Sequence, residues 1–406
     1  MAVSVVNEAK RCLHCKKPMC RTGCPINTPI PDFIELFKNQ KLDEAGKLLF
    51  ENNPFSIICS LVCDHEAQCE GHCILNNKGQ GIHISSIENY ISEAYLDKME
   101  PVMQPKNGQK VGVVGSGPAG ITIGVVLAQR GYDVTIFESR EKIGGVLRYG
   151  IPEFRLPKTI LDRYKKKLLQ MGIHIRTNAV IGRSLSVDDM FADGYSSVFI
   201  GTGVWKPNRL HIPGESFGHV HFAINYLASP DEFDLGENTV VIGAGNSAMD
   251  VARTAIRKGV KNVYLMCRRN KSRASALEVE YAEADGVQFM YGTSPTRITD
   301  DGVIYTQSEF DEEGNVISQQ EDQFLPVNSV IIAVSQGALH RVVNSSTGIE
   351  MTAKDTLATD ATGHTTREGI FAAGDVSTGA KTVVEAVRDA KIVADAMDEY
   401  MTGLRG

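Results

Sequence analysis

Two segments of this 406-residue chain follow the order strand, glycine-rich turn, helix, strand, and they restrict the possible folds more than any other feature. The first segment is KVGVVGSGPAGITIGVVLAQRGYDVTIFE, from Lys110, and the second is NTVVIGAGNSAMDVARTAIRKGVKNVYLMCRR, from Asn238. Glycines allow the backbone to turn sharply after a buried strand and to bring a pyrophosphate to the N-terminus of the following helix. The sequence therefore predicts an α/β protein with two dinucleotide-binding domains.

The first turn by itself is compatible with FAD or NAD, and the motifs around it favour FAD. Glu138 ends the next strand, where a carboxylate can accept hydrogen bonds from ribose hydroxyls. Further close backbone approaches are expected at EKIGGVLRYG and FIGTG. Near the C-terminus an Asp can bind a ribityl hydroxyl, and a helix N-terminus can stabilise a reduced flavin. The predicted FAD-binding residues are Gly115, Gly117, Pro118, Ala119, Gly120, Glu138, Gly145, Arg148, Gly203, Gly374, Asp375, Thr382 and Val383.

The second turn is predicted to prefer NADP over NAD, because the strand that follows it ends in arginines and not in an acid. A carboxylate would repel a 2′-phosphate, whereas guanidinium groups bind one bidentately. The alternative is that these cations form a solvated basic loop. The residues predicted to contact the nicotinamide coenzyme are Gly243, Gly245, Asn246, Ser247, Arg268, Arg269 and Arg273.

Eight of the nine cysteines lie within the first 73 residues, in two groups. Nothing in the sequence indicates the oxidising compartment that a disulfide framework needs. Zinc also accepts thiolates, but closed four-cysteine zinc sites usually show several C-x2-C pairs, and here there is one. A dense cysteine run that ends in Cys-Pro is closer to iron–sulfur sequences, so the spacing favours clusters over zinc. The two groups are Cys12-x2-Cys15-x4-Cys20-x3-Cys24-Pro25 and Cys59-x3-Cys63-x5-Cys69-x3-Cys73.

Composition limits the partners and the compartment. A formal net charge of −7 gives no reason to expect nucleic acid or an anionic membrane as a partner. No apolar run reaches the length of a membrane-spanning helix, and the first residues, MAVSVVNEAKRC, lack the apolar core of a signal peptide. We therefore expect a cytoplasmic protein.

Changes in the residue pattern along the chain predict three domains. Residues 1–107 are expected to form a helical cluster domain, with helical spacing in PDFIELFKNQKLDEAGKLLFENN and a further helix in SSIENYISEAYLDK capped by Ser85 or Ser86. The polar stretch EPVMQPKNGQ is predicted to be a linker. Residues 108–215 together with 338–406 should form the FAD-binding domain, and residues 216–337 the inserted NAD(P)H-binding domain.

Together these motifs resemble the glutamate synthase small-subunit family. The family includes the NADPH-binding half of dihydropyrimidine dehydrogenase and the NADPH-binding subunit of the electron-bifurcating NADH-dependent ferredoxin:NADP oxidoreductase. The resemblance covers essentially the whole chain and implies two [4Fe–4S] clusters, one FAD and a nicotinamide site. The segments that carry it are CLHCKKPMCRTGCP, NNPFSIICSLVC, GIPEFRLP, the second turn with its two arginines, and AAGD followed by KTVVEAV.

The resemblance also implies the cluster ligands, of which one is not a cysteine. Relatives supply Gln or Glu from a helix about 20 residues after Cys69, and the match here is Glu88 in ISSIENYI. The alternative is that Glu88 is a carboxylate on the helix surface. Cys59 is then not a ligand, although counting cysteines alone would make it the eighth. The implied sets are Cys12, Cys15, Cys20 and Cys73 for one cluster, and Cys24, Cys63, Cys69 and Glu88 for the other.

The expected function is electron transfer from NAD(P)H through FAD and the clusters to a partner redox subunit. Hydride transfer between the cofactors needs no protein acid or base, so no catalytic residue is predicted. Two alternatives remain: a thiol–disulfide oxidoreductase, and a zinc-stabilised redox or interaction protein without enzymatic activity. The first is disfavoured because the flavin half contains no C-x-x-C motif, and Cys267 has no partner cysteine nearby.

Overall fold

The computed structural model describes residues 4–404, which divide into two compact units. The first unit contains the chain up to Leu147, Glu153–Val204, and the chain from Ala338 onward. The second contains Arg148–Pro152 and Trp205–Gly337. The helical N-terminal part and the first dinucleotide-binding domain, which the sequence suggested as separate domains, thus share one compact unit. The long segment of the second unit begins at Trp205, whereas the NAD(P)H-binding domain was expected to begin at residue 216.

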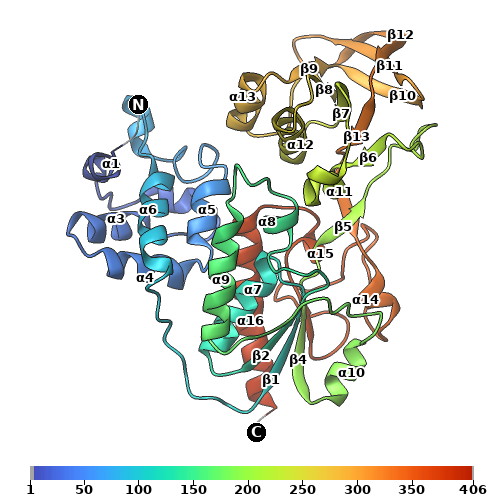
Figure 1. Ribbon diagram of the computed structural model, residues 1–406. Coiled ribbons are helices and arrows are strands. Elements are labelled where there is room, and N and C mark those ends of the chain that lie inside the picture. The colour runs from blue at the N-terminus through green and yellow to red at the C-terminus, as the bar shows by residue number, and fades with distance from the viewer. Residues whose placement is uncertain (1–3, 405–406) are drawn as a thin grey trace. The chain divides into compact units, whose positions relative to one another are not determined.

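The N-terminal part of the first unit is a small helical module around its own apolar core (Figure 1). Phe33, Leu49, Ile87 and Ile91 are all fully buried there, because their spacing places them on the inner faces of the helices. The helices are α1 (Val5–Arg11), α2 (Met19–Gly23), α3 (Ile30–Lys38), α4 (Leu42–Asn52), α5 (Ser56–Val62), the 3-10 helix η1 (Ile74–Lys78) and α6 (Ile84–Leu96).

The long amphipathic stretch forms two helices, α3 and α4, and between them Gln40 adopts a left-handed backbone conformation (φ +62°). One detail of this module differs from the expectations. Helix α6 is not capped by Ser85 or Ser86, because it already begins at Ile84, after His83. The backbone N–H of Ser85 instead donates to Glu70 Oε1 at 2.7 Å, so a carboxylate from a preceding loop satisfies the helix N-terminus.

A five-stranded parallel sheet forms the centre of the rest of the first unit, in the order β15-β4-β1-β2-β3. Its inner strands are buried on both faces, as expected for continuous apolar runs such as VGVV. Helices α7 and α16 pack against each other and cover one face (Figure 1). The strands are β1 (Lys110–Val114), β2 (Asp133–Phe137), β3 (His174–Arg176), β4 (Tyr195–Ile200) and β15 (Ile370–Ala372). The helices of this part are α7 (Pro118–Gln129), α8 (Val146–Tyr149), α9 (Lys158–Gln170), α10 (Val187–Ala192), α14 (Arg341–Asn344), α15 (Asp375–Thr378) and α16 (Val383–Gly403).

The helical module is fastened to this α/β part by contacts from α9 and α16. The hydroxyl of Tyr164, which is buried, donates to the carbonyl oxygen of Pro54, and its ring lies 5.2 Å from that of Phe55. Lys391 Nζ donates to the carbonyl oxygen of Asn52 at 2.7 Å. These contacts bring residues that are far apart in the sequence together inside one unit, independently of the linker.

The second unit contains a second five-stranded parallel sheet, in the order β6-β13-β7-β8-β9. Beside it lies a three-stranded antiparallel sheet, β10-β11-β12, which accounts for the strand-rich pattern after the second glycine turn. The strands are β6 (Val220–Phe222), β7 (Asn238–Ile242), β8 (Asn262–Cys267), β9 (Gln288–Tyr291), β10 (Thr293–Thr299), β11 (Gly302–Phe310), β12 (Val316–Pro326) and β13 (Ser329–Ile332). The helices are α11 (Ala223–Ala228), η2 (Pro230–Glu232), α12 (Asn246–Arg257) and α13 (Ala276–Ala284).

Two short strands, β5 (Val204–Pro207) and β14 (Gln336–Ala338), pair where the chain leaves and re-enters the first unit. Within residues 4–404, no helix combines the length and the apolar character that crossing a membrane requires.

Candidate cofactor sites

The first glycine turn joins β1 to α7, and a different steric requirement explains why each of its three glycines is a glycine. Gly115 has φ +102°, and a Cβ there would lie 2.5 Å from the carbonyl oxygen of Gly201. A Cβ on Gly120 would lie 2.0 Å from the carbonyl oxygen of Gly115, so the helix could not pack so closely on the strand. A Cβ on Gly117 would meet no described atom within 4 Å, so this position faces open space. The turn therefore fits a pyrophosphate placed beside Gly117, at the N-terminus of α7.

Glu138 lies beside this turn, at the residue that follows β2, and only 5% of it is exposed. Its carboxylate accepts hydrogen bonds from the backbone N–H of Ser116 (3.1 Å) and of Arg140 (2.8 Å), and from the hydroxyl of Ser116. These donors fix the orientation of the carboxylate next to the glycine turn. This is the position from which a carboxylate reaches a bound ribose.

Two other glycine loops close around the first turn. The N–H of Gly144 donates to the carbonyl oxygen of Ser116 at 3.0 Å, and a Cβ on Gly145 would lie 2.8 Å from Gly117 Cα. A Cβ on Gly374, which has φ +76°, would lie 3.1 Å from Ala119 Cβ. Three segments that are distant in the sequence therefore pack at one place. Gly203 also has positive φ (+69°) and belongs to the same unit, whereas Arg148 belongs to the second unit.

Asp375 and Thr382 lie at the start of the C-terminal helices. Asp375 begins α15 directly after Gly374 and accepts a hydrogen bond from the N–H of Lys381 at 3.1 Å. Burial raises the pKa of Asp375 to about 6. The Thr382 side chain caps α16 in a reciprocal pair with Glu385, and Val383 is the first residue of that helix. A polar side chain and a helix N-terminus are thus available beside the first glycine turn.

The second glycine turn joins β7 to α12 in the second unit. A Cβ on Gly243, which has φ +136°, would lie 2.3 Å from the carbonyl oxygen of Ala333, whereas one on Gly245 would meet no described atom within 4 Å. The loop after β8 folds back onto this turn, because the N–H of Arg273 donates to the carbonyl oxygen of Ala244 at 2.9 Å. Asn246 opens α12, and its side-chain oxygen accepts from the N–H of Ser275 at 3.0 Å.

Three arginines surround this second turn with positive charge. Arg268 and Arg269 directly follow β8, and Arg273 lies in the loop that folds back. All three are exposed, and none forms an ion pair with another residue of the described range 4–404. No acid ends β8, so no carboxylate occupies the place from which it would repel a 2′-phosphate.

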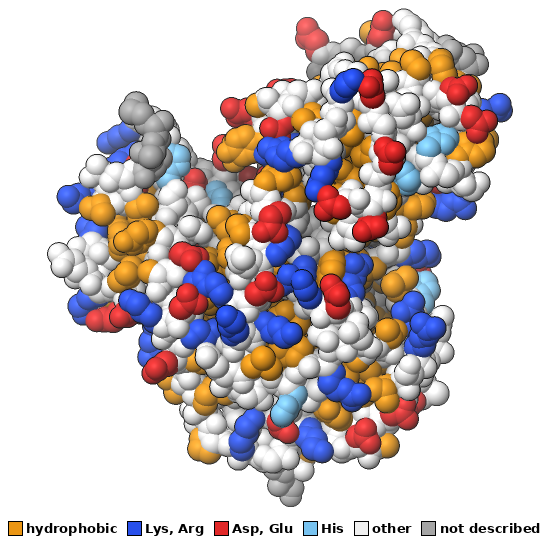
Figure 2. All heavy atoms as spheres, viewed as in Figure 1, with side chains coloured by type: hydrophobic (Ala, Val, Ile, Leu, Met, Phe, Trp, Pro, Cys, Tyr) orange, Lys and Arg blue, Asp and Glu red, His pale blue; other side chains and the backbone are white. Residues whose placement is uncertain are grey.

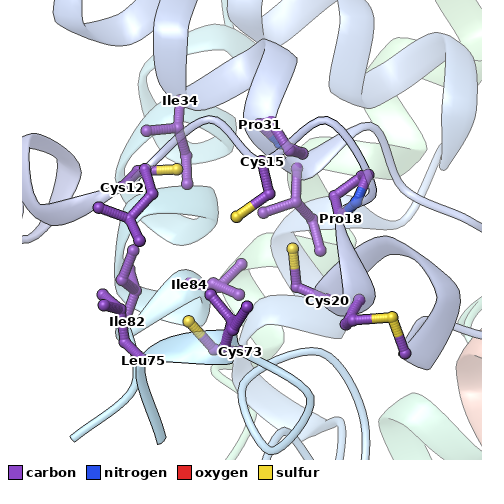
Figure 3. Close-up of a pocket in the computed structure, with 14 residues that line it drawn as sticks. Cys12, Cys15, Pro18, Cys20, Pro31, Ile34, Cys73, Leu75, Ile82 and Ile84 are labelled. Atoms are coloured by element: carbon purple, nitrogen blue, oxygen red, sulfur yellow. The ribbon is translucent and has the colours of Figure 1, made fainter. Parts of the chain in front are cut away.

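Four cysteines of the helical module face one pocket. Figure 3 shows the sulfur atoms of Cys12, Cys15, Cys20 and Cys73 directed toward a common space. The four residues come from the loop after α1, from α2 and from the residue before η1. Burial, followed by the neighbouring cysteines, raises the pKa of Cys20 to about 11, so the Cys20 thiol needs a compensating cation to be a thiolate at neutral pH. The rest of the pocket is largely apolar and includes Pro18, Ile30, Pro31, Ile34, Ile82 and Ile84.

A second group gathers where α5, α6 and the loop before η1 meet. Burial raises the pKa of Cys69, and Glu88 and Cys24 are among the nearby groups that raise it further. A hydrogen bond with Cys59, then burial, raises the pKa of Cys63, with Glu88 and Cys69 also close enough to contribute. The four residues that the resemblance implied as one ligand set therefore lie in one electrostatic neighbourhood.

Glu88 is 7% exposed and therefore is not a carboxylate on the helix surface. Burial, followed by Cys59 and Glu70, raises its pKa well above the ordinary range. Its carboxylate makes no hydrogen bond or ion pair with another residue of the described range 4–404, although it lies beside several cysteines. A buried carboxylate of this kind needs a proton or a cation, and a cluster iron would supply the cation. Cys59 lies in the same neighbourhood, so proximity does not separate it from the ligand set.

The donor arrangement fits clusters better than zinc. A zinc site brings its donors within about 2.0–2.3 Å of one point. In the described part of the chain, no group of three or more His, Cys, Asp or Glu side chains converges in a way that could hold a single metal ion. In a [4Fe–4S] cluster each cysteine binds a different iron, so the sulfurs surround a volume, as they do in Figure 3. All nine cysteines are free of disulfides.

Comparison with known families finds matches to three family models along the chain. Residues 2–100 match the family described as dihydropyrimidine dehydrogenase domain II, 4Fe-4S cluster. Residues 183–390 match the pyridine nucleotide-disulphide oxidoreductases, and residues 113–158 match the NAD(P)-binding Rossmann-like domain.

Several curated proteins are similar over nearly the whole chain. The small chain of NADPH-dependent glutamate synthase from Azospirillum brasilense is 31% identical, over 97% of this chain and 88% of its own. The PreT subunit of NAD-dependent dihydropyrimidine dehydrogenase from Salmonella typhimurium is 31% identical, over 98% and 94%. The beta subunit of NADP-dependent formate dehydrogenase from Moorella thermoacetica is 30% identical, over 94% of this chain and 60% of its own.

Solved structures share the fold of the α/β part. FprA from Mycobacterium tuberculosis has a TM-score of 0.61 with 17% identity, and covers 74% of this chain and 86% of its own. Thioredoxin reductase from T. acidophilum has a TM-score of 0.57 with 22% identity, and covers 73% and 99%. At this level of identity, the two similarities show a shared fold and nothing more.

The raised pKa of Asp375 predicts a pH-dependent stability. Between pH 4 and 6 the folded state retains a proton that the unfolded state has lost, so the Asp375 contribution to stability falls as the pH rises through this range. A pKa raised to about 6 in the folded state corresponds to a loss of about 2–3 kcal/mol in the free energy of unfolding once the pH is above 6. The apoprotein of Asp375→Asn should therefore be about 2–3 kcal/mol more stable than wild type at pH 7.5, and nearly equal to it at pH 4, in urea denaturation.

Asp301→Asn, at an exposed position, provides the control and should behave alike at both pH values. If Asp375→Asn changes stability by the same amount at pH 4 and pH 7.5, the burial of this carboxyl does not have the stated effect.

Proposed function

This chain belongs to the glutamate synthase small-chain family of NAD(P)H-dependent flavin oxidoreductases, and on that basis we propose that it transfers electrons from NADPH, through FAD and two [4Fe–4S] clusters, to a partner redox subunit. The observation that carries the proposal is the joint presence, in one compact unit, of a four-cysteine pocket and a FAD-type glycine turn. A cysteine pocket that served only to stabilise the fold would not need a nucleotide turn held in the same unit.

The chemistry that a bound flavin would supply is the acceptance of a hydride equivalent and the release of single electrons. The chain's own residues then have binding and positioning roles. Gly117 leaves space for a pyrophosphate, Glu138 is oriented toward a ribose, and Thr382 caps the helix whose N-terminus can stabilise negative charge. No protein acid or base is needed, and none is proposed.

The coenzyme is proposed to be NADPH in preference to NADH. Arg268, Arg269 and Arg273 are exposed beside the second turn and have no ion-pair partner among residues 4–404, so they can bind a 2′-phosphate without first losing an ion pair. Gly245, Asn246 and Ser247 at the start of α12 would hold the pyrophosphate.

Two clusters are proposed, because the described cysteines fall into two neighbourhoods. Seven cysteines and Glu88 give four ligands for each cluster. The group around the pocket would bind one cluster, through Cys12, Cys15, Cys20 and Cys73, and the group around α5 and α6 the other, through Cys24, Cys63, Cys69 and Glu88.

A partner subunit is proposed as the acceptor of the electrons, on the basis of the relatives. The relatives named above are themselves called a small chain or a subunit. A thiol–disulfide oxidoreductase is the alternative enzyme. It is disfavoured because Cys267 is buried and is the only cysteine after Cys73, so the flavin half has no cysteine pair to reduce.

The electron count tests the proposal as a whole. FAD accepts two electrons and each [4Fe–4S] cluster accepts one, so about two equivalents of NADPH should reduce the anaerobic holoprotein fully. The flavin and cluster absorbances are followed during the titration, with iron and acid-labile sulfide measured on the same sample. Zinc without sulfide, or no bleaching of the flavin by NADPH, would overturn the proposed function.

The coenzyme preference is tested at the arginines. Arg268→Ala/Arg269→Ala should raise KM for NADPH by roughly 10- to 100-fold and leave KM for NADH nearly unchanged, because only the contact to the 2′-phosphate is lost. The exposed Arg297→Ala is the matched control and should change neither value. An unchanged ratio of kcat/KM for the two coenzymes in the double variant would show that these arginines do not select NADPH.

The eighth ligand is tested by comparing Glu88 with Cys59. Glu88→Ala should alter the electron paramagnetic resonance signal of one reduced cluster and leave the other as it is, whereas Cys59→Ala should retain both signals and about eight irons per chain. Cys63→Ala serves as the positive control for losing the same cluster. If Cys59→Ala loses a cluster and Glu88→Ala does not, the eighth ligand is Cys59.

A further inference from the structure

The rim of the four-cysteine pocket exposes apolar side chains to solvent. Leu13 is 62% exposed, Met19 52% and Ile74 50%, and all three line the pocket that contains the four sulfur atoms. Exposed apolar side chains that gather at one place, unlike single scattered ones, indicate an interaction surface. We call these residues, together with the cations described next, the cluster rim.

Positive charge surrounds the apolar centre. Lys16, Lys17, Arg21 and Lys78 are exposed and form no ion pair with any residue of the described range. The two segments that carry the pocket cysteines, residues 9–31 and 71–83, contain no Asp or Glu. Figure 2 shows Lys and Arg side chains beside hydrophobic ones on the visible face of the helical module.

The acids that flank these two segments in the sequence are Glu8, Asp32 and Glu70, and they are fewer than the four cations of the cluster rim. Glu8 is paired with Arg11 at 2.8 Å, and Glu35 with Lys38 at 2.8 Å. The cations of these two pairs are additional to the four of the cluster rim, so the unpaired charge there remains positive. The whole chain carries a net charge of −7, so the cluster rim is a local positive region on an acidic protein.

We propose that the cluster rim is the docking surface for an acidic redox protein, which receives electrons from the cluster held by Cys12, Cys15, Cys20 and Cys73. An apolar centre with a charged border is the usual composition of a protein interface, and the border charges select a partner of opposite sign. Cys12, Cys15 and Cys20 are only half-buried, so a partner seated there comes close to the cluster. This inference rests on the proposed function, because it concerns where the electrons leave the chain.

For an acceptor that takes one electron, the electron balance requires two docking events for each coenzyme oxidised. One NADPH supplies two electrons and releases NADP⁺ and one proton, and each one-electron acceptor takes one of the electrons. An acceptor must therefore dissociate and be replaced, or must carry more than one redox centre. A border of exposed charges suits rapid exchange, since such charges accelerate association more than they strengthen the complex.

Other occupants fit the cluster rim less well. An anionic membrane or a nucleic acid carries the right charge for the cations, but neither accepts electrons and neither needs to approach a cluster. A second copy of this chain is acidic overall, but contact between two cluster rims would bring like charges together. The adjacency of the patch to the cysteine pocket favours a redox protein over all three.

The test measures binding and does not depend on turnover. The anaerobic holoprotein is immobilised, and the dissociation constant for a small acidic [2Fe–2S] ferredoxin is measured at about 20 and 300 mM salt, with basic cytochrome c as the opposite probe. The variants are Lys16→Glu/Lys17→Glu and, farther from the cysteines, Lys78→Glu. The matched control is Lys165→Glu/Lys166→Glu, which reverses an adjacent lysine pair on α9.

The wild type and the control should bind ferredoxin at low salt and lose at least about tenfold in affinity at high salt. Lys16→Glu/Lys17→Glu should bind it about tenfold more weakly at low salt, Lys78→Glu a few-fold more weakly, and both should bind cytochrome c better than wild type. The cluster absorbance of each variant is recorded to show that the cluster is intact.

Three results would overturn the inference: no ferredoxin binding by wild type at low salt, an equal loss of affinity in the control pair, or binding to phosphatidylserine vesicles or to further copies of the chain in place of ferredoxin. Bleaching of the flavin by NADPH is measured separately. If it occurs while docking fails, only this inference is wrong, and if it does not occur, the proposed function is wrong whatever binds at the cluster rim.

Discussion

The close approach of α7 to β1 at the first glycine turn is the contact on which the first unit depends. The helix can begin directly after the strand only because Gly120 has no Cβ to meet the carbonyl oxygen of Gly115. The same short turn leaves Gly117 open and brings Ser116 against Glu138, so one steric condition forms the phosphate site and orients the ribose-binding carboxylate. The loops of Gly145 and Gly374 then pack on the turn. A larger residue at Gly120 would therefore disturb both the fold and the site.

The elements set by local sequence were predictable, and those set by distant contacts were not. Both glycine turns, the parallel sheets they belong to and the helix that Thr382 caps follow from short motifs whose steric needs are known. The break at Gln40 was not foreseen, because a non-glycine residue in a left-handed conformation has no strong sequence signal. The capping of α6 by Glu70 was not foreseen either, because the carboxylate comes from a separate loop.

The cysteine sites, too, were predictable where local sequence sets them and not where distant contacts do. Spacing indicates clusters, but it does not assign four ligands to each of two neighbourhoods, because Cys20 and Cys73 meet only in the folded chain. The burial of Glu88 likewise depends on how α6 packs, and the seven-residue interval from Ile84 to Ile91 on the buried face was the available signal that residue 88 would point inward too. The exposed Leu13, Met19 and Ile74 could not be singled out from sequence, where they look like ordinary core residues.

The contacts of Tyr164 with Pro54 and of Lys391 with Asn52 join the helical module to the α/β part without using the linker. A carrier domain on a tether must diffuse to its donor, so its rate depends on viscosity and on tether length. Here the separation between the first nucleotide site and the cysteine pocket is instead a constant of the folded unit. Electron tunnelling between them would run at a rate fixed by geometry, because neither site has to move to reach the other.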